Sequence, residues 1–576
     1  MIFNSYADNT MKSTLLFLAA ITVLGTIAVR DLLHTGYFES HDGVIHVMRL
    51  THFDEALKSG QFPVRWLSTW SGGYGSPVFN FIWPLPYYVA ALIHWIGFSY
   101  AASIKLILLA SFALSGFTFY LFFYEISRNR FAAFAGSMLY LWAPYRFTDI
   151  FIRGALGEAT SFLFLPLVLW IVHVGSRSEK RSVSPFWGVV IALFIFTHNM
   201  MAVLGVGFMT LYAVWLTVKD KISYRFLLSL LWVIGIGCGI AATYWLPAVV
   251  EQSYTRLSSY LSGSYGMHFV PLPALFNSAW KYAYAAPWSQ EHSMSFQVGL
   301  VHWLLFFLSF IFLPLVYKNY KQMRPVVSHG IFFLITAVVL ILMITTPTGE
   351  QLYHFIPQLS FLNYPWRLLE IMTFALSVVG ATLVAIIGKG QKLAGIALVI
   401  TLIYINLPMS RIVSQSLTYS DQEYYQLIRT NTGFLPDSEF LPPGYEFHTL
   451  LKERGDKNRD LVEFVDNNNN GNMHTETLSP LHFKTSVITS EPQQVRINQF
   501  FFPGWQVKVN TNLVEITKDE FGLMQIAVPS GSNTVEVAFQ NTWTRIIANV
   551  VSALSATIIL VLGIWQIMRR KVRVSF

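Results

Sequence analysis

Long apolar runs separated by short polar segments dominate the sequence. Twelve of these runs are candidates for membrane-spanning helices, because the longest reach the roughly 20 residues needed to cross a hydrocarbon core and all are bounded by polar residues. They cover residues 13–33, 100–124, 131–143, 159–175, 186–196, 200–217, 226–246, 298–316, 329–345, 368–387, 393–408 and 546–568. The further apolar stretch 79–97 contains WPLPYY and is better explained as a helix lying at the outer membrane interface.

Basic residues collect in short segments between these runs. The segments are SRNR at 127–130, SRSEKR at 176–181, KDK at 219–221, KNYKQMR at 318–324, GKGQK at 388–392 and RRKVR at 569–573. With twelve spans all of them fall on one side of the membrane, and the positive-inside rule makes that side the cytoplasm. We therefore predict a multi-pass protein of a bacterial inner (cytoplasmic) membrane with both termini in the cytoplasm.

Composition agrees with a bilayer as the main solvent. Hydrophobic residues make up 54% of the chain and charged residues only 12%, against roughly 25% charged in an ordinary soluble domain. The formal net charge of +8 is spread over the short loops and forms no continuous basic face, so a nucleic-acid partner is not expected. No Gly-rich phosphate loop follows a predicted strand, which argues against a cytoplasmic nucleotide substrate.

The polar segment 410–545 differs in kind from the rest of the chain. An Asn-rich stretch, NNNNGN, is followed by alternating runs such as WQVKV and TVEVAF, and this alternation predicts a small β-sandwich. The predicted domains are a transmembrane domain at 1–409 with an outer first loop at 34–99, an extracytoplasmic β-rich domain at 410–545, and a final helix with a basic cytoplasmic tail at 546–576.

The first outer loop contains a candidate catalytic face. If residues 42–57 are helical, Asp42, His46 and Arg49 are spaced i, i+4 and i+7 and share one face. That face offers a base, an imidazole and a phosphate ligand. Two simpler readings are an amphipathic helix whose polar side meets water, and an Asp42 that only caps the helix. A divalent metal at Asp42 and His46 stays open, because no third ligand is marked in the sequence.

Charged residues also gather at a second membrane boundary, within PYRFTDIFIRGALGEATSF. The four charged residues of this segment are Arg146, Asp149, Arg153 and Glu158. Charges beside apolar spans are costly unless they pair or bind something, so they are a candidate substrate site; the alternative is a snorkelling cluster that marks span ends. Arg367, in YPWR at the start of a span, either binds phosphate or pairs with Glu370 one turn later.

Several motifs together resemble a known family. HDGVIHVMR, GYGSPVFNF, YRFTDIFIRGALGEA, THN, YPWR and FFPGWQVKV resemble those of bacterial membrane proteins described as 6-pyruvoyl-tetrahydropterin-synthase-related. That description points to a soluble zinc enzyme, but the chain shows no matching metal site. The acidic residue in the first outer loop and the many-span body resemble the GT-C superfamily of membrane glycosyltransferases.

The GT-C resemblance implies a function and roles for the candidate residues. It implies a polytopic α-helical fold that transfers a sugar from a polyprenyl-phosphate donor, held partly in the lipid bilayer, to a glycan, lipid or protein acceptor on the outer face. Asp42 would be the general base, and Arg146, Arg153 and Arg367 would hold the donor phosphate. The alternatives are a lipid-linked sugar flippase or transporter and a non-catalytic membrane assembly protein.

Overall fold

The computed structural model describes residues 2–261, 264–285, 287, 292–430, 437–443, 450, 460–465 and 471–574. The chain forms two compact units, each built from segments that are distant in sequence. The first unit comprises residues 1–44, 101–238 and 261–418, and the second comprises residues 45–100, 239–260 and 419–576. Because these units do not follow the chain order, the division at residues 409 and 545 stays a prediction.

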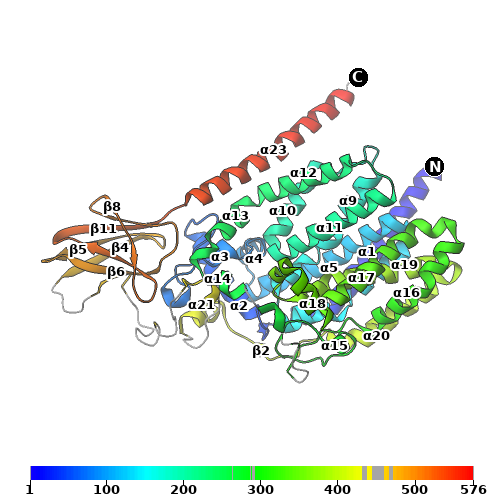
Figure 1. Cartoon of the computed structure of the whole chain (residues 1–576), viewed down its shortest axis with the longest axis horizontal. Coiled ribbons are helices and arrows are strands. Elements are labelled where there is room, and N and C mark those ends of the chain that lie inside the picture. Colours follow the sequence, from blue (N-terminus) through cyan, green and yellow to red (C-terminus); the bar gives the residue numbers. More distant parts are fainter. Residues whose placement is uncertain are drawn as a thin grey trace. The chain divides into compact units, whose positions relative to one another are not determined.

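The first unit is a bundle of long apolar helices, several of which run along a common direction (Figure 1). Its longer helices are α1 (Ile2–Ala28), α5 (Tyr100–Ser127), α6 (Arg130–Leu141), α9 (Phe164–Arg177), α10 (Gly188–Thr197), α11 (Asn199–Lys219), α12 (Arg225–Ile240), α16 (Leu300–Asn319), α17 (Arg324–Ile344), α19 (Leu369–Ile386) and α20 (Gln391–Asn406). Its shorter helices are α7 (Pro144–Phe147), α8 (Leu156–Ser161), α15 (Leu272–Phe276) and α18 (Thr348–Phe355). Two-residue strands β1 (Tyr37–Phe38) and β2 (Ser416–Leu417) pair antiparallel.

Helix α19 is the centre of this bundle. It packs against α6, α16 and α17, and nearly all of its residues are buried. Its sequence, LEIMTFALSVVGATLVAI, is apolar on every side, as expected of a helix that is covered all round. Glu370, in its first turn, is therefore a buried carboxyl group.

Within the described residues, eight helices are long and apolar enough to cross a membrane, and a ninth is added if α12 and α13 (Ala242–Glu251) count as one broken span. Ser13–Ala28 and Pro185–Thr197 are shorter apolar helices. Each of the twelve runs expected from the sequence thus contains helix, and the number that cross stays a prediction. In the stretch 79–97 the main helix, α4 (Leu85–Trp95), has 11 residues, about half the length that a span requires.

The second unit combines short helices, a β-rich region and a long terminal helix. Its helices are α2 (Gly43–Lys58), which begins at the end of the first unit, α3 (Val78–Phe81), α4, α13, α14 (Leu257–Leu261), α21 (Asp421–Thr430) and α23 (Trp543–Val574). Its strands are β3 (Val462–Phe464), β4 (Asn472–Ser479), β5 (His482–Thr489), β6 (Gln493–Phe500), β7 (Trp505–Val509), β8 (Asn512–Val514), β9 (Thr517–Lys518), β10 (Leu523–Val528) and β11 (Gly531–Phe539).

The strands confirm the predicted β-rich region. They form a four-stranded sheet, β3-β6-β10-β9, and a five-stranded sheet, β4-β5-β11-β7-β8, and every pairing is antiparallel (Figure 1). In β5 and β7 buried and more exposed residues alternate, which is the pattern of strands with one covered face. A buried ion pair lies beside the sheets, where the Arg545 guanidinium donates to Glu251 Oε2 over 2.9 and 3.1 Å.

Candidate active site

The segment that ends at Asp42 is fixed against the carboxyl end of a π-helix, Thr148–Arg153. The backbone N–H of His41 donates to the carbonyl of Ile152 over 3.1 Å, and that of Asp42 donates to the carbonyl of Arg153 over 2.8 Å. The side of the segment nearer the N-terminus is held by the β1–β2 pairing. Asp42 is half-buried, so backbone contacts hold its position while part of the residue stays exposed.

One glycine, Gly154, permits this close approach. Gly154 ends the π-helix in the left-handed conformation, with φ +62°, where a residue with a side chain is strained. A Cβ atom at Gly154 would lie 2.4 Å from Ser40 Oγ and 2.8 Å from the backbone nitrogen of Gly43. A side chain at this position would therefore push away the segment that contains Asp42.

Arg153 is the central cation of a buried cluster of charges in the first unit. Its Nη1 lies 2.5 Å from Asp149 Oδ1 and 2.8 Å from Glu158 Oε1. Glu158 Oε1 also accepts a hydrogen bond from the Tyr145 hydroxyl over 2.6 Å. Burial opposes the charge on Arg153, but Glu158, Asp149 and Asp42 favour it and raise the pKa of Arg153 well above its ordinary value. The cluster therefore holds Arg153 as a permanent cation next to Asp42.

Arg367 joins this cluster from the start of α19. Its Nε lies 3.4 Å from Glu158 Oε2, and its guanidinium lies over the Tyr364 ring. The side chain of Arg367 is 17% exposed, against 6% for Arg153. Arg367 thus pairs with Glu158 and not with Glu370, which instead accepts a hydrogen bond from Ser161 over 2.8 Å. The sequence offered a pair of Arg367 with Glu370, but α8 brings Glu158 within reach of Arg367 instead.

Arg146 is more buried than Arg153 and is enclosed by aromatic rings. Its guanidinium carbon is 4.0 Å from the Phe162 ring centroid and 4.5 Å from that of Phe112, and its Nη2 donates to Ser115 Oγ over 2.9 Å. Burial lowers the pKa of Arg146 to about 10, so it remains charged at neutral pH. A cation stacked on rings and removed from solvent is suited to stabilising the cluster.

Several polar atoms of the cluster have no hydrogen-bond partner among the described residues. They are Nε and Nη1 of Arg146, Oδ2 of Asp149 and Oε1 of Glu370. Native proteins satisfy the great majority of buried polar groups, so unsatisfied ones usually have a functional reason or an unseen water or ligand. Unsatisfied polar groups in one buried cluster therefore favour a bound ligand or water over side chains that only snorkel to the membrane surface.

His46 and Arg49 lie on α2 in the second unit and have partners there. His46 Nδ1 is 2.6 Å from the Tyr87 hydroxyl. Arg49 forms an ion pair with Asp437, with its Nε 3.0 Å from Asp437 Oδ2. The structure therefore gives both residues partners within their own unit, and their contact with a substrate stays a prediction. Asp437 was not expected from the sequence, because it is 388 residues away from Arg49 along the chain.

Two histidines, His41 and His198, lie close to the charged cluster. His41 Nε2 is 2.7 Å from the Ala283 carbonyl, and burial lowers the pKa of His41. His198 Nδ1 accepts a hydrogen bond from the backbone N–H of Met201 and so caps α11. Among the described residues, no group of three or more His, Cys, Asp or Glu side chains is placed to hold a metal ion.

Comparison with known proteins assigns the family. The model of the 6-pyruvoyl-tetrahydropterin synthase related domain, described as a membrane protein, matches residues 79–418, which is more than half of the chain. The chain belongs to this family. The matched range contains the charged cluster from Arg146 to Arg367, whereas Asp42 precedes it.

Among solved structures, the chain is similar to the oligosaccharyltransferase of Archaeoglobus fulgidus in complex with zinc and sulfate, with 12% sequence identity and a TM-score of 0.37 over 73% of this chain. The match covers 56% of the length of that protein. No curated protein matches the chain.

The main site residue that the sequence did not mark is Tyr145. It stands next to Arg146 in the motif YRFT, but nothing in its spacing shows that its hydroxyl meets Glu158, because the π-helix and Gly154 turn the chain back between them. The signal that could have pointed to it is a polar aromatic residue beside an intramembrane charge.

Proposed function

We propose that the chain is an integral membrane glycosyltransferase of the GT-C type. It transfers a sugar from a polyprenyl-phosphate donor to a glycan, lipid or protein acceptor at the outer face of a bacterial inner membrane. The observation that carries the proposal is the backbone hydrogen bond between Asp42 and Arg153. This contact joins the segment of the proposed base to the buried charged cluster, which supports a single site that combines a base with a phosphate-stabilising charge.

The residues of the site take different roles in this reaction. Asp42 accepts the proton of the acceptor nucleophile as that nucleophile attacks the anomeric carbon. The bond from that carbon to the donor phosphate breaks, and the leaving phosphate takes the bonding electron pair. Arg367 is the most exposed of the three arginines and contacts this phosphate. Arg153 and Glu158 position Arg367, and the fully buried Arg146 stabilises the cluster.

The rest of the architecture follows from the same proposal. Twelve spans in a GT-C-like arrangement place Asp42 and the β-rich region outside, both termini in the cytoplasm, and the donor's isoprenoid chain among the helices. The two antiparallel sheets form a β-sandwich on the outer side of the membrane in this proposal. Single exposed cysteines test this topology: Lys221→Cys lies on the predicted cytoplasmic side and Asn512→Cys on the predicted outer side. An impermeant thiol reagent added from outside should label Asn512→Cys and not Lys221→Cys.

Sugar transfer in proteoliposomes tests the proposed function. The purified chain is given a panel of labelled polyprenyl-phosphate sugars with an extract of envelope lipids and glycans as acceptors. Transfer of label to an acceptor from at least one donor supports the proposal. Movement of the labelled lipid across the bilayer without transfer would contradict it and identify a flippase. Absence of both activities in a folded, reconstituted protein would favour an assembly role.

A further inference from the structure

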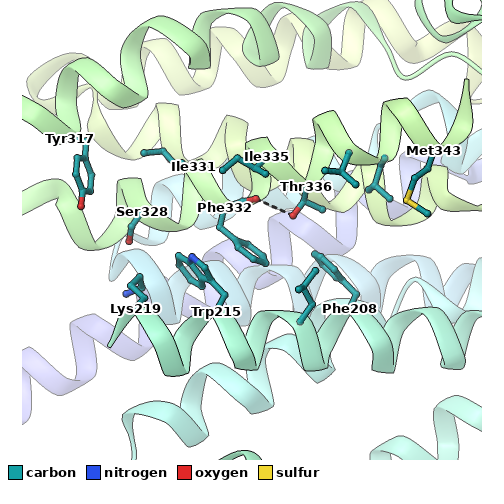
Figure 2. Close-up of a pocket in the computed structure, with 13 residues that line it drawn as sticks. Phe208, Trp215, Lys219, Tyr317, Ser328, Ile331, Phe332, Ile335, Thr336 and Met343 are labelled. Atoms are coloured by element: carbon teal, nitrogen blue, oxygen red, sulfur yellow. Dashed lines mark hydrogen bonds between the residues drawn. The ribbon is translucent and has the colours of Figure 1, made fainter. Parts of the chain in front are cut away.

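A second candidate site lies between two helices of the first unit, away from the charged cluster. A groove of about 640 Å³ runs along α11 and α17, which is within the range of pockets that bind small molecules. Most of its lining is apolar, as at Phe208, Phe332 and Met343, while Lys219, Tyr317 and Ser328 line it at one end only (Figure 2). Such a lining suits a ligand with a hydrocarbon chain and a polar head.

Lys219 lines the polar end of the groove, and a second cation, Arg324, contacts the lining residue Tyr317. Lys219 Nζ lies 5.2 Å from the Trp215 ring centroid and 2.7 Å from Asp220 Oδ1. Arg324 is outside the lining, but its guanidinium lies 5.3 Å from the Tyr317 ring centroid, and its Nε donates to the Tyr317 carbonyl over 2.8 Å. The head of a bound molecule would thus meet Lys219 and the hydroxyl groups of Tyr317 and Ser328, with the charge of Arg324 next to Tyr317.

The predicted position of the polar end in the membrane further limits the class of ligand. Both α11 and α17 are long and apolar enough to cross a membrane, so the open side of the groove faces lipid chains. The cationic end coincides with the basic segments at 219–221 and 318–324, which the positive-inside rule places in the cytoplasm. Lys219 and His198 are at opposite ends of α11, about 30 Å apart along the helix. The groove is therefore separate from the proposed transfer site.

We propose that this groove binds an anionic glycerophospholipid of the cytoplasmic leaflet. One acyl chain lies along the apolar lining, and the phosphate group lies between Lys219 and the Arg324–Tyr317 pair. Basic pockets between transmembrane helices on the cytoplasmic side are suited to anionic headgroups. A zwitterionic lipid offers less net charge to these two cations, so headgroup charge decides the selectivity. This binding goes beyond the proposed glycosyltransferase and does not depend on it.

Fluorescence quenching of Trp215 tests the proposal. The full-length protein is reconstituted in phosphatidylcholine that contains a small fraction of either phosphatidylglycerol or phosphatidylcholine brominated in the upper acyl chain. Quenching of Trp215 by the brominated lipid is taken as the difference between the quenching of the wild type and that of Trp215→Phe. We expect the brominated phosphatidylglycerol to occupy the groove roughly 30-fold more tightly than the brominated phosphatidylcholine, or about fivefold for each cation.

Variants at the cationic end separate a specific site from general lipid contact. Lys219→Gln or Arg324→Gln should each reduce the preference for phosphatidylglycerol about fivefold, and either variant suffices if the other fails to fold. Lys221→Gln, an exposed position in the same loop, should leave the preference unchanged. Equal quenching by both headgroups, or an unchanged preference in both groove variants, would overturn the proposal. Displacement of phosphatidylglycerol by a polyprenyl phosphate at equal or lower concentration would also overturn it, by assigning the groove to an isoprenoid lipid.

Discussion

The placement of Asp42 depends on a contact that a single methyl group should break. In Gly154→Ala the new Cβ would meet Ser40 Oγ at 2.4 Å and the Gly43 nitrogen and Cα at 2.8 and 2.9 Å. The left-handed backbone at φ +62° adds a cost of about 1–2 kcal/mol for any residue other than glycine. Overpacking against backbone atoms that are themselves hydrogen-bonded adds about 1–3 kcal/mol.

A matched glycine separates these two contributions. Gly388 has a similar φ of +72°, and its Cβ would meet no heavy atom within 4 Å. Gly388→Ala therefore carries only the backbone cost. We expect Gly154→Ala to lose about 1–3 kcal/mol more stability than Gly388→Ala, measured as the difference between their thermal unfolding midpoints in detergent.

The same pair of variants reports on function. Because the displaced segment contains Asp42, the Gly154→Ala variant should lose sugar transfer by about a hundredfold, as a shift of about 1 Å in a catalytic group can cause. Gly388→Ala should retain it. Equal destabilisation of the two variants, together with equal transfer activity, would refute the idea that the π-helix end positions Asp42.

Two further predictions concern the surroundings of this site. Glu158→Gln leaves its arginine partners buried without their counter-charge and should cost about 3–5 kcal/mol, whereas the exposed Glu179→Gln should change stability by less than about 0.5 kcal/mol; similar thermal midpoints for the two would contradict the ion-pair geometry. Burial and the nearby Arg367 lower the pKa of His198 to about 3, so the folded state resists protonation that the unfolded state accepts below its pKa of about 6.5. Stability should therefore fall as the pH falls from about 6.5 toward 3, by about 1.4 kcal/mol per pH unit for this group. His198→Asn keeps a capping acceptor and should flatten that slope between pH 6 and 4 in thermal unfolding; an unchanged slope would show that His198 is not neutral in the folded state.

The apolar pattern predicted much of the fold, because span length and strand alternation are local properties. Helix lies in each of the twelve expected runs, and the described strands β3 to β11 lie in the segment expected to be β-rich. Local pattern could not predict the two compact units, since they join residues 45–100 to residues 419–576 through contacts between distant segments. The ion pair of Arg49 with Asp437 is one such contact.

The candidate site was predictable in its residue types and only partly in its pairings. Charges at a membrane boundary must be neutralised, so the sequence singled out Arg146, Arg153, Glu158 and Arg367. Which charge meets which depends on the π-helix, whose single extra residue per turn leaves no periodic trace in the sequence. For that reason Arg367 faces Glu158, although Glu370 is nearer along the chain.

The most direct test of the account compares sugar transfer by the wild type and Asp42→Asn. Asparagine keeps the size and the capping capacity of aspartate but cannot act as a general base. Both proteins are reconstituted at equal amounts after their thermal midpoints have been matched, with Glu39→Gln as a control for loss of a nearby negative charge. The account predicts that Asp42→Asn lowers the transfer rate by about 10²–10⁴ while Glu39→Gln transfers at the wild-type rate. Wild-type transfer by Asp42→Asn would contradict it.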